Sequence, residues 1–343
     1  MRALALAGAL ALPIAASAGR AYVSNEGDGT VSVLDTTRGV VIGTIAVGKR
    51  PRGLVLSRDG SRLYVAVTGV PRCPPAVSHA ECARKPRDLS ADGVAVVDTR
   101  KLERIAQLSA GSDPIAIALS RSERTLFVAN EDASAVCVVD LRSGTILTHI
   151  HVPRSPQALR MSPNDEWVGV ASDAEHTFSL IDSHLLESLT RQSVGSRPEN
   201  FAFSPDGRNT YVADELGGAV YRLGVPSGSG GAPALRLSAP TKLAQLPHMA
   251  RPSGIALDPS RRRLYVTTGR QGTVAVIALD DPLHIAEVRV GELPRAPALS
   301  PNERWLFTAD AGSADVSVID TITLRRVETI RVGRAPWGLA VGQ

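Results

Sequence analysis

The stretch Pro156-Gln157-Ala158-Leu159-Arg160-Met161-Ser162-Pro163-Asn164-Asp165-Glu166 begins one complete copy of a unit that closes at Val194-Gly195-Ser196-Arg197-Pro198. The unit has four parts: a Pro followed by an apolar run ending in Ser-Pro-Asn/Asp, a short aromatic and Val run, a Val-x-Val-x-Asp run, and a run that closes at Val-Gly. Each part has the length and alternation of a β-strand, and Gly, Pro, Asn or Asp separates the parts. The unit therefore predicts four short strands.

Two markers show how often this unit recurs. The opening Pro returns at intervals of 63, 42, 42, 54, 42 and 42 residues, and a marker in the second run returns at intervals of 42, 63, 42, 42, 54 and 42. Both series indicate seven copies of a 42-residue unit, two of which carry insertions. The opening prolines are Pro51, Pro114, Pro156, Pro198, Pro252, Pro294 and Pro336, and the second markers are Tyr22, Tyr64, Phe127, Gly169, Tyr211, Tyr265 and Phe307.

Seven four-stranded units without helices predict an all-β fold. Each small sheet has to bury its faces against the sheets on either side, and radial stacking around an axis achieves this. We therefore predict a seven-bladed β-propeller with four antiparallel strands in each blade. The chain begins with a second strand at Ala21-Tyr22-Val23 and ends with a first strand from Pro336 to Val341. The two terminal strands should share one blade, which closes the ring and removes two open sheet edges.

The start of the chain differs from the rest. Arg2, an apolar run from Ala3 to Ala16 and the small residues up to Ala18 form the pattern of a secretory signal. We expect residues 1–18 to be a signal peptide, and residues 19–343 to form a single propeller domain of an exported, periplasmic protein. No other stretch is long and apolar enough for a membrane span. The insertions are expected at about residues 69–91 and about 226–241.

The three cysteines suit an oxidising compartment without a disulfide-built fold. Cys73 and Cys82 lie in the first insertion, where we predict a local disulfide. Cys137 stands in a Val-rich run and is expected to be a small buried residue. There is no Cys-x-x-Cys-His motif, so covalent c-type haem is not expected.

The charge and the histidines exclude other functions. The net charge of +4 comes from scattered Arg rather than from a Lys/Arg run, so nucleic-acid binding is not expected. Of the seven histidines, only His149 and His151 have a spacing that places two ligands on one strand face, and two are too few to predict a metal site. The chain also has no Gly-x-Ser-x-Gly, His-Glu-x-x-His, Walker or Gly-x-Gly-x-x-Gly motif.

One face of the predicted ring gathers charged residues. Because strand direction alternates, the loop that enters a blade and the loop between its second and third strands emerge on the same face. The entering loops carry an Arg one or two residues before the Pro in five of the seven units, and the second-to-third loops carry acidic residues. The predicted ligand-binding residues of this face are Arg50, Arg154, Arg197, Arg251, Arg334, Glu26, Glu131, Glu215, Asp310, His176 and His248.

Two interpretations of these charges stay open. Several Arg converging on an axial pocket favour a carboxylate or phosphate ligand through bidentate bonds. Alternatively, the Arg and the acidic residues pair across neighbouring blades and hold the ring together. Residues that break the repeat are of more interest, and Trp337 is the only aromatic residue directly after an opening Pro.

Several segments resemble the YVTN-type β-propeller repeat family. They are Ala21-Tyr22-Val23-Ser24-Asn25, Thr30-Val31-Ser32-Val33-Leu34-Asp35, Leu126-Phe127-Val128-Ala129-Asn130-Glu131 and Asp315-Val316-Ser317-Val318-Ile319-Asp320. The ending Ile330-Arg331-Val332-Gly333-Arg334-Ala335-Pro336-Trp337-Gly338 resembles the exported propellers associated with quinone-cofactor (PQQ)-dependent alcohol catabolism. The resemblance implies an accessory or binding role with no agreed catalytic residues. Fold similarity also extends to the seven-bladed lactonases and to the haem-carrying propeller of respiratory nitrite reductase.

Three hypotheses about function follow. The first is a monomeric periplasmic binding or accessory protein, not an enzyme, whose Arg-rich face holds a small anionic ligand, for example PQQ, or a redox or quinoprotein partner. The second is a lactonase-like hydrolase in which Glu131 or Glu215 serves as base and Arg stabilises the oxyanion. The third is a structural surface or adhesion module.

Overall fold

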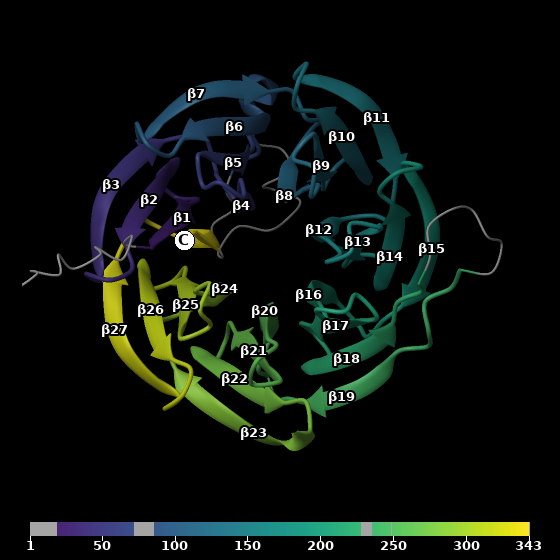
Figure 1. Ribbon diagram of the computed structural model, residues 1–343, viewed down its shortest axis with the longest axis vertical. Coiled ribbons are helices and arrows are strands. Elements are labelled where there is room, and N and C mark those ends of the chain that lie inside the picture. The colour runs from purple at the N-terminus through teal and green to yellow at the C-terminus, as the bar shows by residue number, and fades with distance from the viewer. Residues whose placement is uncertain (1–18, 72–85, 228–234, 248, 343) are drawn as a thin grey trace, which may run out of the picture.

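The structure is a computed structural model that describes residues 19–71, 86–227, 235–247 and 249–342. In this part of the chain, 28 β-strands form seven sheets of four strands each. Figure 1 shows these sheets arranged as blades around a common axis. The prediction of an all-β, seven-bladed propeller with four antiparallel strands per blade is therefore confirmed.

The blades are numbered here in chain order, and their strands are given from the axis outward. Blade 1 contains β28 (Pro336–Val341), β1 (Arg20–Asn25), β2 (Thr30–Asp35) and β3 (Val40–Ala46). Blade 2 contains β4 (Leu54–Leu56), β5 (Arg62–Val67), β6 (Gly93–Asp98) and β7 (Glu103–Leu108). Blade 3 contains β8 (Pro114–Leu119), β9 (Thr125–Asn130), β10 (Ala135–Asp140) and β11 (Thr145–His151).

The other four blades repeat this order. Blade 4 contains β12 (Pro156–Met161), β13 (Trp167–Ser172), β14 (Thr177–Asp182) and β15 (Glu187–Ser193). Blade 5 contains β16 (Pro198–Phe203), β17 (Asn209–Asp214), β18 (Ala219–Gly224) and β19 (Thr241–Gln245). Blade 6 contains β20 (Pro252–Asp258), β21 (Arg263–Thr268), β22 (Thr273–Ala278) and β23 (Asp281–Arg289). Blade 7 contains β24 (Pro294–Leu299), β25 (Trp305–Asp310), β26 (Asp315–Asp320) and β27 (Arg325–Arg331).

Blade 1 closes the ring. Strand β28, from the end of the chain, pairs antiparallel with β1, and Ala21 lies opposite Val341 while Tyr22 lies opposite Ala340. Figure 1 shows the yellow end of the chain beside the purple first strand. The predicted sharing of one blade by both terminal strands is confirmed, and β28 covers the edge of β1 that would otherwise face the axis.

Apolar side chains fill the spaces between blades. Between blades 4 and 5, the rings of Phe178 and Phe201 lie 4.8 Å apart, and those of Phe201 and Phe203 lie 5.5 Å apart, in edge-to-face arrangements that aromatic pairs favour. Gly169 stands at the position that other units fill with Tyr or Phe. A Cβ atom at Gly169 would lie 2.7 Å from a ring atom of Phe201. The rings of Phe201 and Phe203 in blade 5 therefore occupy the space that a side chain at this position would need.

The third-strand Asp residues end their strands by binding the turn that follows. Asp35 accepts hydrogen bonds from the backbone N–H groups of Thr37 and Arg38, and Asp182 accepts them from His184 and Leu185. The aspartate of the Val-x-Val-x-Asp run therefore has a structural role in the turn. Cys137 of β10 is fully buried and free, as predicted.

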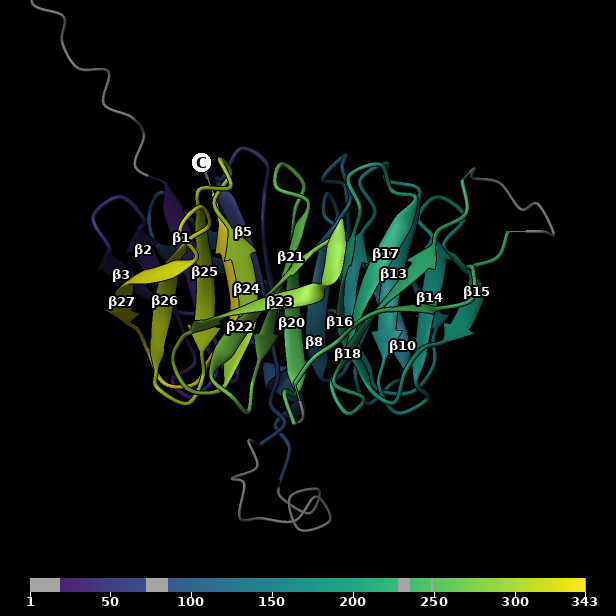
Figure 2. The same cartoon turned by 90° about the horizontal axis from the view of Figure 1, so that it is seen from below.

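The loops that enter a blade lie against the loops between its second and third strands. Backbone N–H groups of the second-to-third loops donate to the entering loops, for example from Glu131 to Asp113 and from Glu215 to Arg197. The predicted grouping of these loops on one face is confirmed. Figure 2 shows the ring from the side, with the C-terminal end at the upper face.

Some predictions fall on residues outside the described ranges. Residues 1–18, Cys73, Cys82 and His248 belong to this group, as do parts of both expected insertions. The described end of the first insertion forms a short 3-10 helix, η1 (Leu89–Ala91). Among the described residues, no helix has the length and apolar character needed to cross a membrane.

Candidate functional site

The five predicted arginines are all engaged in ion pairs. Glu215 bridges two of them, because its carboxylate lies 3.2 Å from the Arg197 guanidinium and 3.4 Å from that of Arg251. We call this set the ion-pair belt. Its pairs are Arg50 with Glu26, Arg154 with Glu175, Arg197 with Asp173 and Glu215, Arg251 with Glu215, and Arg334 with Asp28.

The belt connects loops within a blade and loops of neighbouring blades. Arg197 enters blade 5 but binds Asp173 of blade 4 at 2.9 Å, and Arg251 enters blade 6 but binds Glu215 of blade 5. These are the ion pairs that the second interpretation of the charges predicted. A ligand-binding role for the arginines stays a prediction.

The other predicted residues on this face are also placed by the structure. Asp310 is fully buried and accepts hydrogen bonds from Thr308, Ser317 and the backbone N–H of Gly291. Burial raises the pKa of Asp310 to about 6. His176 is an exposed turn residue with a φ of 55°. Neither Asp310 nor His176 lines the cavity on the axis of the ring.

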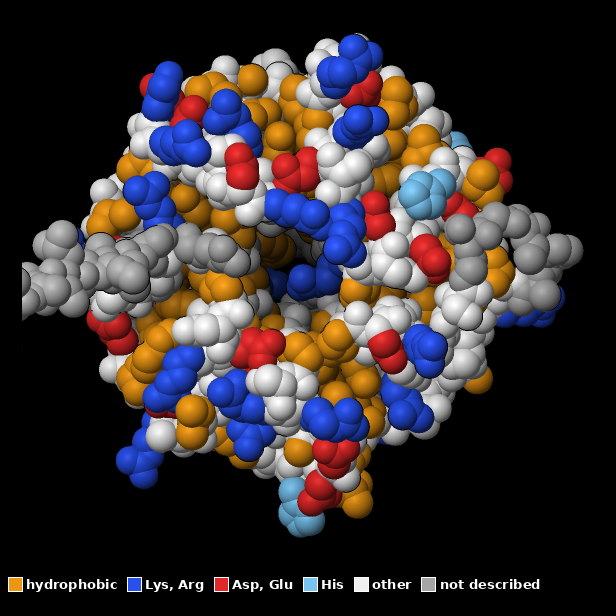
Figure 3. Space-filling model, in the orientation of Figure 1, with side chains coloured by type: hydrophobic (Ala, Val, Ile, Leu, Met, Phe, Trp, Pro, Cys, Tyr) orange, Lys and Arg blue, Asp and Glu red, His pale blue; other side chains and the backbone are white. Residues whose placement is uncertain are grey.

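A cavity of about 140 Å³ lies on the axis of the ring. Every residue that lines it comes from the innermost strand of a blade or from the residue directly before β4. Figure 3 shows the hollow at the centre of the molecule, with Lys and Arg side chains at its rim. We call this cavity the axial pocket, and none of the described residues predicted for the ligand face lines it.

A β-bulge or irregularity follows the opening proline in six of the seven inner strands, all except β4. In β12 the pairing with β13 skips Gln157, and in β16 the pairing with β17 skips Glu199. A bulge of this kind re-aims a side chain and commonly occurs beside functional sites. The residues that directly follow the opening prolines are Arg52, Ile115, Gln157, Glu199, Ser253, Arg295 and Trp337, and all except Arg52 line the pocket.

Glu199 is the principal titratable group of the pocket. Its side chain is 12% exposed, and the guanidinium of Arg295 lies 3.8 Å from its carboxylate. Burial raises the pKa of Glu199 to about 7, and the negative charge of Glu215 adds to the rise, while Arg295 and Arg197 oppose it. At neutral pH, Glu199 therefore exists in both protonation states, which suits a group that accepts and returns a proton.

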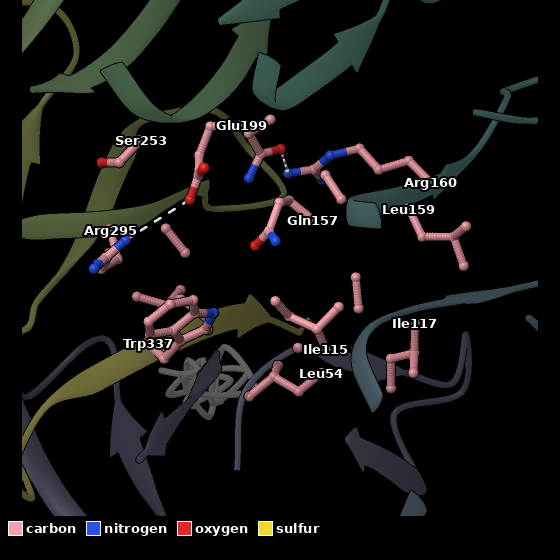
Figure 4. A pocket seen from close by; sticks show the side chains of 17 residues that line it. Leu54, Ile115, Ile117, Gln157, Leu159, Arg160, Glu199, Ser253, Arg295 and Trp337 are labelled. Carbon is pink, nitrogen blue, oxygen red and sulfur yellow. Dashed lines mark hydrogen bonds and ion pairs between the residues drawn. The ribbon is translucent and has the colours of Figure 1, made fainter. Parts of the chain in front are cut away.

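Arg295 is held in place from a second side. Its guanidinium carbon lies 4.4 Å from the ring centre of Trp337, a cation–π contact. Arg52 lies 5.2 Å from the same ring. Figure 4 shows Arg295 between Glu199 and Trp337. Trp337, which the sequence marked as unusual, thus helps to fix the cation that faces Glu199.

Arg160 is the second cation of the pocket. It projects from β12, is exposed within the channel, and donates a hydrogen bond to the Asn200 side-chain oxygen at 3.2 Å. Among the described residues it has no carboxylate within ion-pair distance, in contrast to the arginines of the belt. Asn200 follows Glu199 in β16, so its bond to Arg160 brings that guanidinium close to the strand that carries the carboxylate (Figure 4).

A chain of polar contacts connects the belt with the pocket. Arg52 donates to Glu131 at 3.0 Å, and Gln157 donates to the other oxygen of Glu131 at 3.2 Å. Arg52 also lies 3.4 Å from Glu26 of the belt. Both oxygens of Glu131 are therefore occupied by protein groups.

Sequence reasoning missed Glu199, Arg160 and Arg295. The available signal for Glu199 and Arg295 was the position after each opening Pro, where the seven units have six different side chains while their surroundings repeat. Only Trp337 was singled out there. Among the described residues, no group of three or more His, Cys, Asp or Glu side chains could hold a metal ion. The pocket cations that could meet an anionic cofactor are Arg160 and Arg295.

The chain matches a known family along more than half of its length. A family model described as lactonase, seven-bladed β-propeller, matches residues 83–329. No curated protein matches the chain. These findings favour the lactonase-like alternative over a binding or accessory role. The finer resemblance to YVTN-type repeats and to the PQQ-associated subset is not shown by these matches and stays a prediction.

Solved structures with the same fold include proteins named as lactonases. A periplasmic gluconolactonase of Pseudomonas aeruginosa is 21% identical with a TM-score of 0.72, over 95% of this chain and 99% of that chain. A putative 6-phosphogluconolactonase of Bacteroides fragilis is 16% identical with a TM-score of 0.72, over 96% and 100%. Hydrazine synthase of Kuenenia stuttgartiensis is 21% identical with a TM-score of 0.70, over 88% and 92%. At these identities, the likeness concerns the fold alone.

Proposed function

The chain belongs to the seven-bladed β-propeller lactonase family, and from this premise we propose that the protein hydrolyses a lactone in its axial pocket. The observation that carries the proposal is Glu199, a carboxylate with its pKa raised to about 7 on the pocket wall, with Arg295 beside it. A general base works best when its pKa lies near the working pH. Glu199 meets this condition at neutral pH.

Glu199 accepts and returns one proton in the proposed reaction. A water molecule attacks the lactone carbonyl carbon and gives a proton to the Glu199 carboxylate, and the carbonyl oxygen becomes an oxyanion. When this intermediate collapses, the bond between the carbonyl carbon and the ring oxygen breaks. The departing ring oxygen takes the proton from Glu199. The product is a hydroxy acid, which releases its carboxyl proton to the solvent.

The two pocket arginines have different parts in this proposal. Arg160 has no carboxylate partner among the described residues, so its charge is available to the oxyanion and then to the product carboxylate. A donor preorganised toward an oxyanion contributes about 10²–10³ to the rate. Arg295 is already engaged with Glu199 and Trp337, so it orients the base rather than the substrate.

Glu199 replaces the two carboxylates that the sequence suggested as bases. Glu131 accepts hydrogen bonds from Arg52 and Gln157, and Glu215 binds Arg197 and Arg251. Both carboxylates are therefore engaged with protein groups. Neither lines the axial pocket.

A periplasmic location is part of the same proposal. It rests on the signal-like pattern of residues 1–18. The relative from Pseudomonas aeruginosa is itself described as periplasmic. Mass spectrometry of the protein from a periplasmic fraction tests this: a mature chain that begins near residue 19 supports export, and an uncleaved chain in the cytoplasm contradicts it.

The direct test of the activity is a lactone panel followed by acid release at constant pH. The protein is expected to hydrolyse at least one five- or six-membered lactone faster than buffer. The Glu199→Gln variant keeps the shape of the side chain but loses the base, so kcat should fall by about 10²–10⁴. The matched control is Glu175→Gln in the ion-pair belt, which should keep the wild-type rate.

Two results would overturn the proposal. One is a wild-type protein that hydrolyses no lactone of the panel above the buffer rate. The other is a Glu199→Gln variant that is as active as the wild type, because the reaction would then need no base at this position.

A further inference from the structure

The axial pocket has two chemically different sides. Figure 4 shows Glu199, Arg160, Gln157, Arg295 and Ser253 along one side. On the other side lie apolar side chains, which come from blades 1 to 4. These are Trp337, Leu339, Leu54, Ile115, Ile117 and Leu159. A ligand that fills the pocket therefore meets charge on one side and hydrocarbon on the other.

The polar side offers few free groups. The Ser253 hydroxyl donates to the Pro294 carbonyl oxygen at 2.7 Å, and the Gln157 amide donates to Glu131 and Ser155. The Asn200 side-chain oxygen accepts from Arg160. Besides the Gln157 side-chain oxygen and the Asn200 side-chain NH2 group, the groups left for a ligand are the charges of Glu199 and Arg160, which suit an ester group.

The aliphatic residues of the apolar side cannot satisfy hydroxyl groups. Leu54 and Leu339 are half-buried, and their side chains carry no donor or acceptor. A hydroxyl placed against them loses its water without gaining a partner, which weakens binding. A methylene group in the same place gains about fourfold in affinity when it leaves water.

We infer that the substrate is a lactone with an alkyl or aryl substituent rather than a polyhydroxylated sugar lactone. The inference rests on the proposed function, and it names the substrate class of the same pocket. The ester group lies against Glu199 and Arg160, and the substituent lies against the hydrocarbon side. A volume of about 140 Å³ is close to that of a dry engineered cavity that holds benzene, so a ring with one small substituent fits.

The test compares four five-membered lactones as substrates of the full chain. They are γ-butyrolactone, its γ-propyl and γ-phenyl derivatives, and ribonolactone. The γ-propyl derivative should exceed γ-butyrolactone in kcat/KM by roughly ten- to sixtyfold, at about fourfold per buried methylene. Ribonolactone should be the poorest of the four. Equal or better hydrolysis of ribonolactone would overturn the inference while leaving the proposed hydrolase intact.

A pair of variants locates the preference. Leu339 and Leu299 are both half-buried leucines of inner strands, but only Leu339 lines the pocket. Leu339→Thr should reduce several-fold the ratio of kcat/KM for the γ-propyl derivative to kcat/KM for γ-butyrolactone. Leu299→Thr, the control for a general loss of stability, should keep the advantage. An unchanged preference in Leu339→Thr would contradict the assignment of this wall.

Binding separates failure of the inference from failure of the proposed function. If no lactone is hydrolysed, the corresponding lactams are titrated calorimetrically, because they bind without being turned over. Tighter binding of the γ-propyl and γ-phenyl lactams than of the trihydroxylated lactam would support the ligand class even without lactonase activity. No such difference would overturn it.

Discussion

The ion-pair belt and the axial pocket are both rich in arginine, but they use it differently. In the belt, each Arg lies one or two residues before the opening Pro of its unit and meets an acidic partner, as Arg197 meets Asp173 and Glu215. In the pocket, Arg160 occurs once at its position, and Arg295 shares its position with Arg52 alone. Arg160 is without a carboxylate partner among the described residues, and Arg295 is 3.8 Å from the half-ionised Glu199.

This difference distinguishes charged residues that stabilise the fold of a repeat protein from charged residues that are available to a ligand. A residue that returns in five of seven units serves a need that these units share, and here the need is to tie an entering loop to its neighbour. A residue that departs from its repeat has no such duty. Substitutions in the belt should therefore change stability, and substitutions in the pocket should change activity.

The largest expected effect is on the stability of the belt. Glu26 is buried and lies 2.7 Å from Arg50 and 3.4 Å from Arg52. Glu26→Gln leaves two buried guanidinium groups without this charge, and breaking a buried pair costs about 3–5 kcal/mol. Urea denaturation should show a loss of this size while kcat/KM stays near the wild-type value.

The control for this variant is Glu175→Gln. Its partner Arg154 is 73% exposed, so the pair should contribute less than about 1 kcal/mol. Equal losses of stability in the two variants would show that burial does not strengthen the ion pairs of the belt. If Glu26→Gln instead abolishes activity without unfolding, the division between belt and pocket is wrong.

The next largest effect is expected on the rate of lactone hydrolysis in a variant of Arg160. Arg160→Gln should lower kcat/KM by about 10²–10³, because it removes the charge proposed for the oxyanion. Its stability should stay close to wild type, since no ion pair is broken among the described residues. The matched control Arg154→Gln, a belt arginine, should keep its activity. Steady-state kinetics at neutral pH measure both rates. Equal activity of the Arg160 and Arg154 variants would contradict the role of Arg160 in stabilising the oxyanion.

Glu199→Gln should also change stability, with a sign opposite to that in the belt. The folded-state pKa of Glu199 is about 7, above its ordinary value of 4.5. The folded state therefore binds more protons than the unfolded state between these values, and stability falls as pH rises through this window. At about pH 8 the variant should be up to about 3 kcal/mol more stable than wild type. The difference should vanish near pH 4.5, and denaturation curves at both ends measure it.

The smallest effect links the two regions. The charge of Glu215 raises the pKa of Glu199, so Glu215→Gln should lower that pKa and move the acid limb of the activity profile to lower pH. The maximal rate should stay unchanged, because Glu215 does not line the pocket. An acid limb that stays in place would show that belt and pocket are electrostatically independent.

The fold was predictable because its information is repeated seven times. The spacing of the opening prolines and of Tyr22, Tyr64 and their equivalents gave blade number, strand order and ring closure. The site was predictable only in part. The recurring Arg were correctly placed on one face, where the structure pairs them with acidic residues. Glu199 was not predicted as a site residue, because its orientation depends on a bulge and its pKa on burial. Neither property is visible in the local sequence.

The most direct test of the account is the pH dependence of kcat/KM for the wild-type protein on its best lactone. With Glu199 as the base, kcat/KM should rise about tenfold per pH unit below pH 7 and level off above it. A profile that is flat through pH 7, or that bends near the ordinary Glu value of 4.5, would contradict the account.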